Sequence, residues 1–142
     1  MLNFRINYAV FSIPPSSPFP SGDTIERPML RLKLVNAQQR LSCYAMVDSG
    51  ADYCAFPLSF ARIIGLDTLK LPSSTTMGVG GNSTTFYANV QFDVGPLVLS
   101  AYCGFTSGLD QVGFGLLGQQ GFFDKFTITF DRANHLFDLA MP

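Results

Sequence analysis

The feature that most constrains the fold of this chain is a set of short runs in which apolar and polar residues alternate. Residues 29–35 place leucine at every second position, with basic residues between them. Residues 84–94 repeat the alternation, and residues 97–105 and 126–130 continue it. A period of two residues is typical of a strand with one buried face. The chain therefore predicts an all-β fold, a closed or partly open β-barrel built from many short strands.

Helical periodicity is scarce. Residues 57–64 predict one short helix, because Pro57 suits a first helical position and Gly65 can end the helix. Residues 119–125 are long enough for one or two further helical turns. We therefore expect one or two short helices beside the strands.

A proline-rich segment near the start of the chain predicts an arm. Residues 14–23 contain four prolines and no periodicity, which favours an extended segment or loop. The total length of 142 residues suits one domain. We expect an N-terminal extended arm over residues 1–27 and one domain over residues 28–142.

The charge pattern argues against polyanionic partners. Nine basic and ten acidic residues give a net charge of -1, without a long run of either sign, so neither nucleic acid nor an anionic membrane is an expected partner. No apolar stretch approaches the ~20 residues of a membrane span. Residues 1–13 are interrupted by polar residues and lack a cleavage pattern, so we expect no signal peptide and a cytoplasmic protein.

The potential metal ligands are few and scattered. Cys43, Cys54 and Cys103 form an odd set without the spacing of a metal site, which argues against a disulfide framework or a zinc site. We expect them to be buried apolar fillers, although Cys54 could give the protein a redox sensitivity. His135, the single histidine, lies in a polar turn and is expected to be structural or solvated.

An apolar strand runs directly into an acidic turn at Asp48-Ser49-Gly50. This arrangement can place a carboxylate at the floor of a cleft. Asp, Ser and Gly also dominate ordinary β-turns, so the triplet alone is a weak signal. Other motifs in the sequence are needed to distinguish an ordinary β-turn from a catalytic site.

Hydrolysis by carboxylates needs two of them, because one must be ionised to activate water while the other holds a proton. The chain has a single Asp-Ser/Thr-Gly sequence, and Asp93-Val94-Gly95 lacks the hydroxyl. An enzyme of this type must therefore pair two copies of Asp48 in a homodimer. Ser49 would then hydrogen-bond across the two-fold axis, and Gly50 would permit close backbone approach.

A glycine-rich segment, Met77-Gly78-Val79-Gly80-Gly81, lies between two strand-like runs. So many glycines weaken an ordinary strand but suit a mobile hairpin tip. Such a tip could close over a bound peptide, exclude water and offer backbone amides to the substrate. Val79 is the residue that we expect to cover the substrate, although a plain surface hairpin is the simpler alternative.

Three motifs, taken in order, resemble those of a retroviral-type aspartic protease (retropepsin) subunit. They are Asp48-Ser49-Gly50-Ala51-Asp52, Gly78-Val79-Gly80-Gly81 and Phe114-Gly115-Leu116-Leu117-Gly118. The first matches the family pattern at all five positions. The likeness is closest to the small stand-alone prokaryotic members, and it covers the chain from about Pro28 to Leu139.

The resemblance implies an aspartic endopeptidase that cuts peptides or proteins as a homodimer, without a cofactor or metal. It implies that Asp48 is the catalytic carboxylate and that Ala51 and Asp52 contact the backbone of the bound peptide. Gly78 to Gly81 would form the tip of the flap. Phe114 and Leu116 would line subsites for substrate side chains.

Two alternatives remain open from the sequence. Many relatives place an arginine after the glycine of the last motif, where it pairs with the residue equivalent to Asp52, but this chain has Gln119. Loss of that charge keeps open a non-catalytic member of the fold that binds peptides or serves as a dimerisation module. The fourteen phenylalanines also permit a small barrel that holds an apolar ligand.

Overall fold

Strands dominate the chain in the computed structural model, which describes residues 2–78 and 81–142. The described residues form two compact units. The larger unit runs from Leu30 to Lys125, and the other joins the residues up to Met29 with Phe126–Pro142. The predicted all-β class is confirmed.

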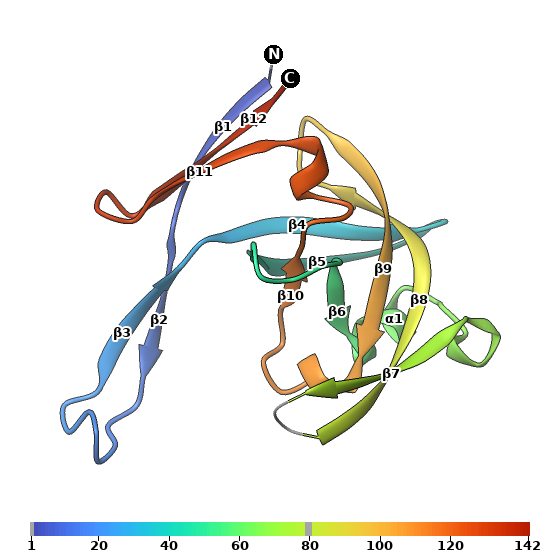
Figure 1. Cartoon of the computed structure of the whole chain (residues 1–142), viewed down its shortest axis with the longest axis horizontal. Helices are drawn as coiled ribbons and strands as arrows, with labels where there is room; N and C mark the ends of the chain where they lie inside the picture. Colours follow the sequence, from blue (N-terminus) through green and yellow to red (C-terminus); the bar gives the residue numbers. More distant parts are fainter. Residues whose placement is uncertain (1, 79–80) are drawn as a thin grey trace. The chain divides into compact units, whose positions relative to one another are not determined.

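A β-barrel forms the core of the larger unit. Its strands are β4 (Met29–Asn36), β5 (Gln39–Val47), β6 (Ala55–Pro57), β8 (Gly81–Asp93), β9 (Val98–Thr106) and β10 (Gly115–Leu117). They pair in the order β4, β5, β10, β6, β9, β8, and β8 then pairs back onto β4. A further strand, β7 (Ser73–Gly78), continues the sheet beyond the ring by pairing with β8 (Figure 1). The sheet is therefore closed, as a barrel requires.

The alternation in the sequence explains which side chains fill this barrel. On β4, Leu32 and Leu34 are buried while Arg31 and Lys33 are exposed. Aromatic side chains fill the space between the strands: the ring centroid of Phe56 lies 5.6 Å from that of Phe92 and 6.1 Å from that of Phe105. All three rings are fully buried. The half-buried strands predicted from the period of two are thus confirmed.

Helix is limited to short segments. The predicted helix is α1 (Leu58–Ile63), which follows Pro57 at its N-cap and ends before Gly65, whose φ is +78°. Single 3-10 turns occur at η1 (Thr68–Lys70), η2 (Ser107–Leu109) and η3 (Phe123–Lys125). The helical turns expected over residues 119–125 are thus reduced to one 3-10 turn. No helix within residues 2–78 and 81–142 is long and apolar enough to cross a membrane.

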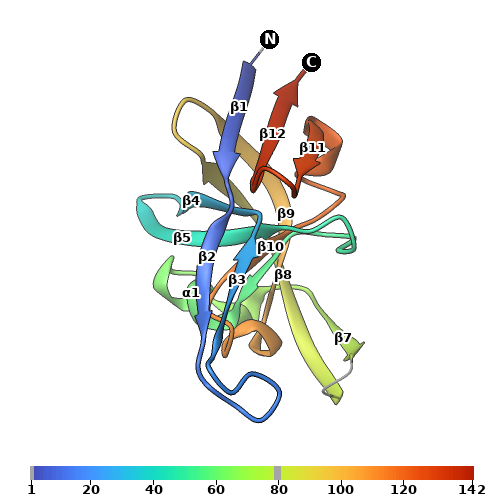
Figure 2. The ribbon, with the colours of Figure 1, turned by 90° about the vertical axis from the view of Figure 1, so that its left-hand side faces the viewer.

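The smaller unit joins the two ends of the chain. Its three-stranded sheet has β12 (Leu136–Met141) between β1 (Leu2–Asn7) and β11 (Thr127–Asp131). The strands β2 (Ala9–Ile13) and β3 (Asp23–Arg27) form a hairpin, and the proline-rich residues form its loop (Figure 2). Residues 2–27 therefore contain three strands. Whether they act as an arm distinct from residues 28–142 stays a prediction.

Candidate active site

The acidic turn lies at the end of β5, where the strand leaves the barrel sheet. Val47 is buried, Asp48 is half-buried, and Ser49 and Gly50 are exposed. The backbone N–H of Asp48 donates to the carbonyl of Leu117 at 3.0 Å, so β10 holds the acid to the sheet. Asp48 thus lies where β5 ends, held to the neighbouring strand and followed by two exposed residues.

The carboxylate of Asp48 is fixed by its own turn. The backbone N–H of Gly50 donates to Asp48 Oδ1 at 2.9 Å, and the N–H of Ala51 donates to the Asp48 carbonyl at 3.2 Å. A Cβ at Gly50 would lie 3.3 Å from Asp48 Oδ1, tighter than most contacts of that kind. Glycine therefore makes room for the carboxylate. The predicted close approach of two such turns in a dimer stays a prediction.

A turn of this kind does not by itself mark a site. Asp93 accepts the same hydrogen bond from Gly95 N–H, also at 2.9 Å, and its carboxylate lies 3.7 Å from the Arg40 guanidinium. An aspartate that bonds the amide two residues on is a common local motif. Asp48 differs from Asp93 in the segment that packs against its turn, residues 116–120, which we call the second loop.

The second loop reaches the acidic turn because β10 lies between the strands on either side of that turn. Leu116 pairs with Met46 of β5 in parallel and with Ala55 of β6 in antiparallel register. A Cβ at Gly118 would come within 2.6 Å of the Ala51 carbonyl oxygen and 2.4 Å of the Tyr53 carbonyl oxygen. Only glycine permits this contact, so the close packing of the two loops has a steric basis.

Two backbone hydrogen bonds and one side-chain hydrogen bond fasten the loops together. Gln119 N–H donates to the Ala51 carbonyl at 2.8 Å, and Gln120 N–H donates to the Asp52 carbonyl at 2.9 Å. The side-chain amide of Gln119 also donates to the carbonyl of Ser49 at 2.8 Å. Sequence reasoning treated Gln119 as the loss of a charge and missed this contact, for which the local sequence carries no signal.

The glycine-rich segment lies at the tip of a hairpin. Strands β7 and β8 pair antiparallel from Ser73↔Phe86 to Gly78↔Gly81. The hydroxyl groups of Ser74 and Tyr87 lie 2.8 Å apart and tie the two strands together. Gly81 has a φ of +106°, which favours glycine. Val79 and Gly80, the predicted centre of the tip, lie outside the described residues.

A hollow of about 390 Å³ opens beside the acidic turn. Asp52, Tyr53 and Ala55 line it from the segment that follows the turn. Strands β8 and β9 contribute Tyr87 and Gly104, among others, and Leu116 lines it from β10. Phe114, predicted beside Leu116 as a subsite residue, is half-buried just before β10 and is not among the described residues that line this hollow.

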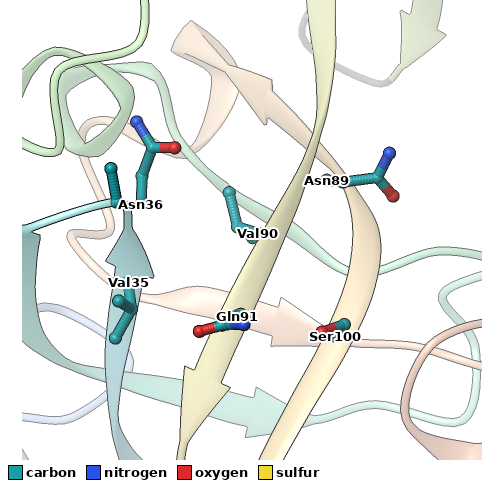
Figure 3. Close-up of a pocket in the computed structure, with 7 residues that line it drawn as sticks. Val35, Asn36, Asn89, Val90, Gln91 and Ser100 are labelled. Atoms are coloured by element: carbon teal, nitrogen blue, oxygen red, sulfur yellow. The ribbon is translucent and has the colours of Figure 1, made fainter.

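A second hollow lies elsewhere on the barrel. It measures about 470 Å³ and is lined by the end of β4 and by β8 and β9. Figure 3 shows Asn36, Asn89, Gln91 and Ser100 around it, and none of its described lining residues is ionisable. Hydrolytic chemistry by an acid has no candidate group there.

The three cysteines are buried and free. Burial raises the pKa of Cys43 to about 12. A hydrogen bond with Cys103 lowers the pKa of Cys54, whereas burial raises the pKa of Cys103. Within residues 2–78 and 81–142, no three His, Cys, Asp or Glu side chains gather as ligands of a metal ion would.

The closed barrel is similar in fold to retropepsin-like aspartic proteases. The chain is similar to the crystal structure of a retropepsin-like aspartic protease from Rickettsia conorii, with a TM-score of 0.57. The match covers 92% of this chain and 98% of that chain at 18% sequence identity. At 18% sequence identity, the similarity shows a shared fold and nothing beyond it. No protein-family model matches the chain, and no curated protein matches its sequence.

Proposed function

We propose that this chain is the subunit of a homodimeric aspartic endopeptidase. The observation that carries the proposal is the fastening of the Asp48 turn by the second loop. Asp93 has the same local turn without such a loop beneath it, so the extra framework distinguishes a positioned acid from an ordinary one. Every described candidate site residue lies within residues 30–125, one compact unit.

The proposed reaction needs an Asp48 from each of two subunits. A water held between the two carboxylates attacks the scissile carbonyl carbon of the peptide. One carboxylate accepts the proton of the water, and the other, protonated, donates to the carbonyl oxygen. The carboxyl group that took the proton of the water then gives it to the amide nitrogen. The tetrahedral intermediate collapses as its hydroxyl group returns a proton to the other carboxylate, which releases the amine and the carboxylic acid. Because the two acids share one proton, the pH profile is bell-shaped and belongs to the pair.

The remaining candidate residues hold the reacting groups and the substrate. Ser49 hydrogen-bonds across the two-fold axis, and Gly50 allows the two turns to approach. Ala51 and Asp52 contact the peptide backbone. Gly78, Val79, Gly80 and Gly81 form a flap that closes over the peptide, while Leu116 and Phe114 contact its side chains.

Cleavage of a peptide library over a range of pH, followed by mass spectrometry, tests the proposal. Asp48→Asn should abolish cleavage while leaving the thermal unfolding temperature close to that of the wild type. Asp93→Asn is the matched control, because it changes an acid in the same kind of turn and should leave cleavage unchanged. Equal cleavage by wild type and Asp48→Asn would rule the assignment out.

A non-catalytic peptide-binding module on the same fold is the competing function. It shares the hollow and the hairpin but needs no acid pair. Binding of labelled peptides, without cleavage, by both wild type and Asp48→Asn would favour this module over the endopeptidase. The contact of Gln119 with Ser49 favours the endopeptidase, because it fastens the acidic turn although the arginine that pairs with the residue equivalent to Asp52 in many relatives is missing.

A further inference from the structure

The hollow beside the acidic turn carries a negative charge without a compensating cation. Asp52 lines this hollow and is exposed. Among the described residues, no side chain forms an ion pair or hydrogen bond with its carboxylate. The nearby Gln119 side chain is directed to the Ser49 carbonyl instead. No lysine or arginine is among the described residues that line the hollow.

The walls of the hollow suit the stem and the head of a long cationic side chain. Tyr53 and Tyr87 both line it. The Tyr87 ring is held in place by stacking on Tyr102, with ring centroids 5.6 Å apart and planes 12° apart, and by its hydroxyl contact with Ser74. A fixed tyrosine face attracts a cation, and Leu116 offers an apolar surface for methylene groups.

Gly104 keeps the hollow open on the β9 side. A Cβ there would come within 2.7 Å of Thr85 Cγ2 and 3.5 Å of Tyr87 Cε1. A larger residue would therefore displace the Thr85 side chain, while its contact with Tyr87 would be an ordinary one. The volume of about 390 Å³ falls within the range of ~300–1,000 Å³ that is usual for ligand pockets, so a long side chain has room.

We propose that this hollow is the subsite for a lysine or arginine side chain of the substrate, with the Asp52 carboxylate as its counter-ion. The inference rests on the proposed endopeptidase function and narrows its substrate class. The aliphatic stem of the substrate side chain packs against Leu116 and the tyrosine rings. Its charged head reaches Asp52, whose second carboxylate oxygen remains available to the peptide backbone.

Paired peptides that differ in one atom group test the subsite. Lysine is compared with norleucine, and arginine with citrulline, at each position around the cleavage site. Because each subunit of the homodimer carries the hollow, we expect the preference at two positions related by the two-fold axis. At these positions kcat/KM should be about tenfold or more higher for the cationic peptide, as a charge-assisted hydrogen bond gives. The preference should shrink in high salt, because exposed charges are screened.

Variants at Asp52 separate the effect of its charge on the preference for cationic peptides from the effect of its shape. Asp52→Asn should bring the lysine-to-norleucine ratio close to one, whereas Asp52→Glu keeps the charge and should retain a preference. Asp67→Asn is the matched control, since Asp67 is an exposed aspartate in the same unit that lines none of the hollows described above and should keep the wild-type ratio. An unchanged ratio in Asp52→Asn would overturn the subsite. So would a loss of dimer in Asp52→Asn with the ratio intact, because Asp52 would then pair with the second subunit.

A binding measurement separates the subsite from the proposed function. Fluorescence anisotropy of the same labelled peptides is recorded with Asp48→Asn and with the Asp48→Asn/Asp52→Asn double variant. Cleavage without a cationic preference overturns the subsite and leaves the endopeptidase in place. Absence of cleavage, together with a cationic preference in binding that Asp52→Asn removes, supports the subsite and overturns the endopeptidase. If the protein neither cleaves nor binds the peptides, both the subsite and the endopeptidase are overturned.

Discussion

At the scale of single residues, Gln119 joins the second loop to the acidic turn without a charge. Its amide donates to the Ser49 carbonyl, so the backbone beside Asp48 is held by a neutral group. An arginine at this position would bring a positive charge toward the acids and could neutralise Asp52. The glutamine leaves Asp52 uncompensated, which is the basis of the proposed cationic subsite.

Replacing Gln119 by Glu should weaken this fastening. An ionised carboxylate has the shape of the amide but cannot donate to a carbonyl oxygen. We expect Gln119→Glu to lower the free energy of unfolding by about 1 kcal/mol, the usual size of one hydrogen bond, and to lower kcat. Chemical denaturation measures the first effect. Gln120→Glu, at the next position, is the control, and an equal effect in both variants would contradict the role of Gln119.

At the scale of elements, β10 places the second loop against the acidic turn. It pairs with β5 on one side and with β6 on the other, and the acidic turn connects those two strands. Gly118 follows β10 and packs directly against the carbonyl oxygens of Ala51 and Tyr53. The geometry of the turn therefore depends on how closely this loop can approach.

Gly118→Ala tests that approach. Its Cβ would collide with two backbone oxygens, which cannot move without shifting the acidic turn. We expect a loss of about 1–3 kcal/mol in the free energy of unfolding, typical of overpacking, together with a loss of cleavage. Gly108→Ala is the control, because its Cβ would lie at an ordinary 3.6 Å from Thr106 Oγ1. Equal stability of the two variants would contradict the account.

At the scale of the whole molecule, the first and last strands of the chain pair with each other. Strands β1 and β12 run side by side, and Arg5 binds Asp138 across them with two hydrogen bonds of 2.8 and 3.0 Å (Figures 1 and 2). The hydrogen bond from Arg5 lowers the pKa of Asp138, and one from Asn134 lowers the pKa of Asp131.

These two aspartates give the smaller unit a pH dependence with a definite sign. A lowered pKa means that the folded state favours the ionised carboxylate, so the stabilisation is present above the ordinary aspartate pKa. It is lost as the pH falls through the lowered value. Carbon NMR titration of the Asp138 carboxyl should show a midpoint below the ordinary range, and Arg5→Met should raise it. A midpoint that Arg5→Met leaves unchanged would contradict the pairing.

Much of this fold follows from local sequence patterns, and its long-range contacts do not. The alternation over residues 29–35 and 84–94 predicts half-buried strands because each side of such a strand faces one environment. The three-residue strand β10 has no alternation that could reveal it, and its two partners lie far away in the sequence. The same holds for the pairing of β1 with β12. Local patterns specify the secondary structure of a segment, whereas the strands with which it pairs depend on the whole chain.

The candidate site follows the same rule. Asp48, Ser49 and Gly50 are candidates because their residue types suit acid chemistry and because the three motifs in order resemble those of a retropepsin. The close packing of Gly118 against Ala51 joins residues far apart in the sequence, and no local pattern predicts it. The hydrogen bond from Gln119 to Ser49 could not be predicted, since a glutamine side chain has many possible partners. The unpaired state of Asp52 depends on that same contact.

The central claim is that the Asp48 of one subunit acts only beside the Asp48 of a second subunit. Subunit mixing tests this claim most directly. Wild type and Asp48→Asn are refolded together in varying ratios at constant total protein, and peptide cleavage is measured. Activity should fall as the square of the wild-type fraction, to about one quarter in an equal mixture, because mixed dimers carry a single acid. A linear fall to about one half would show that each subunit acts alone and would contradict the account.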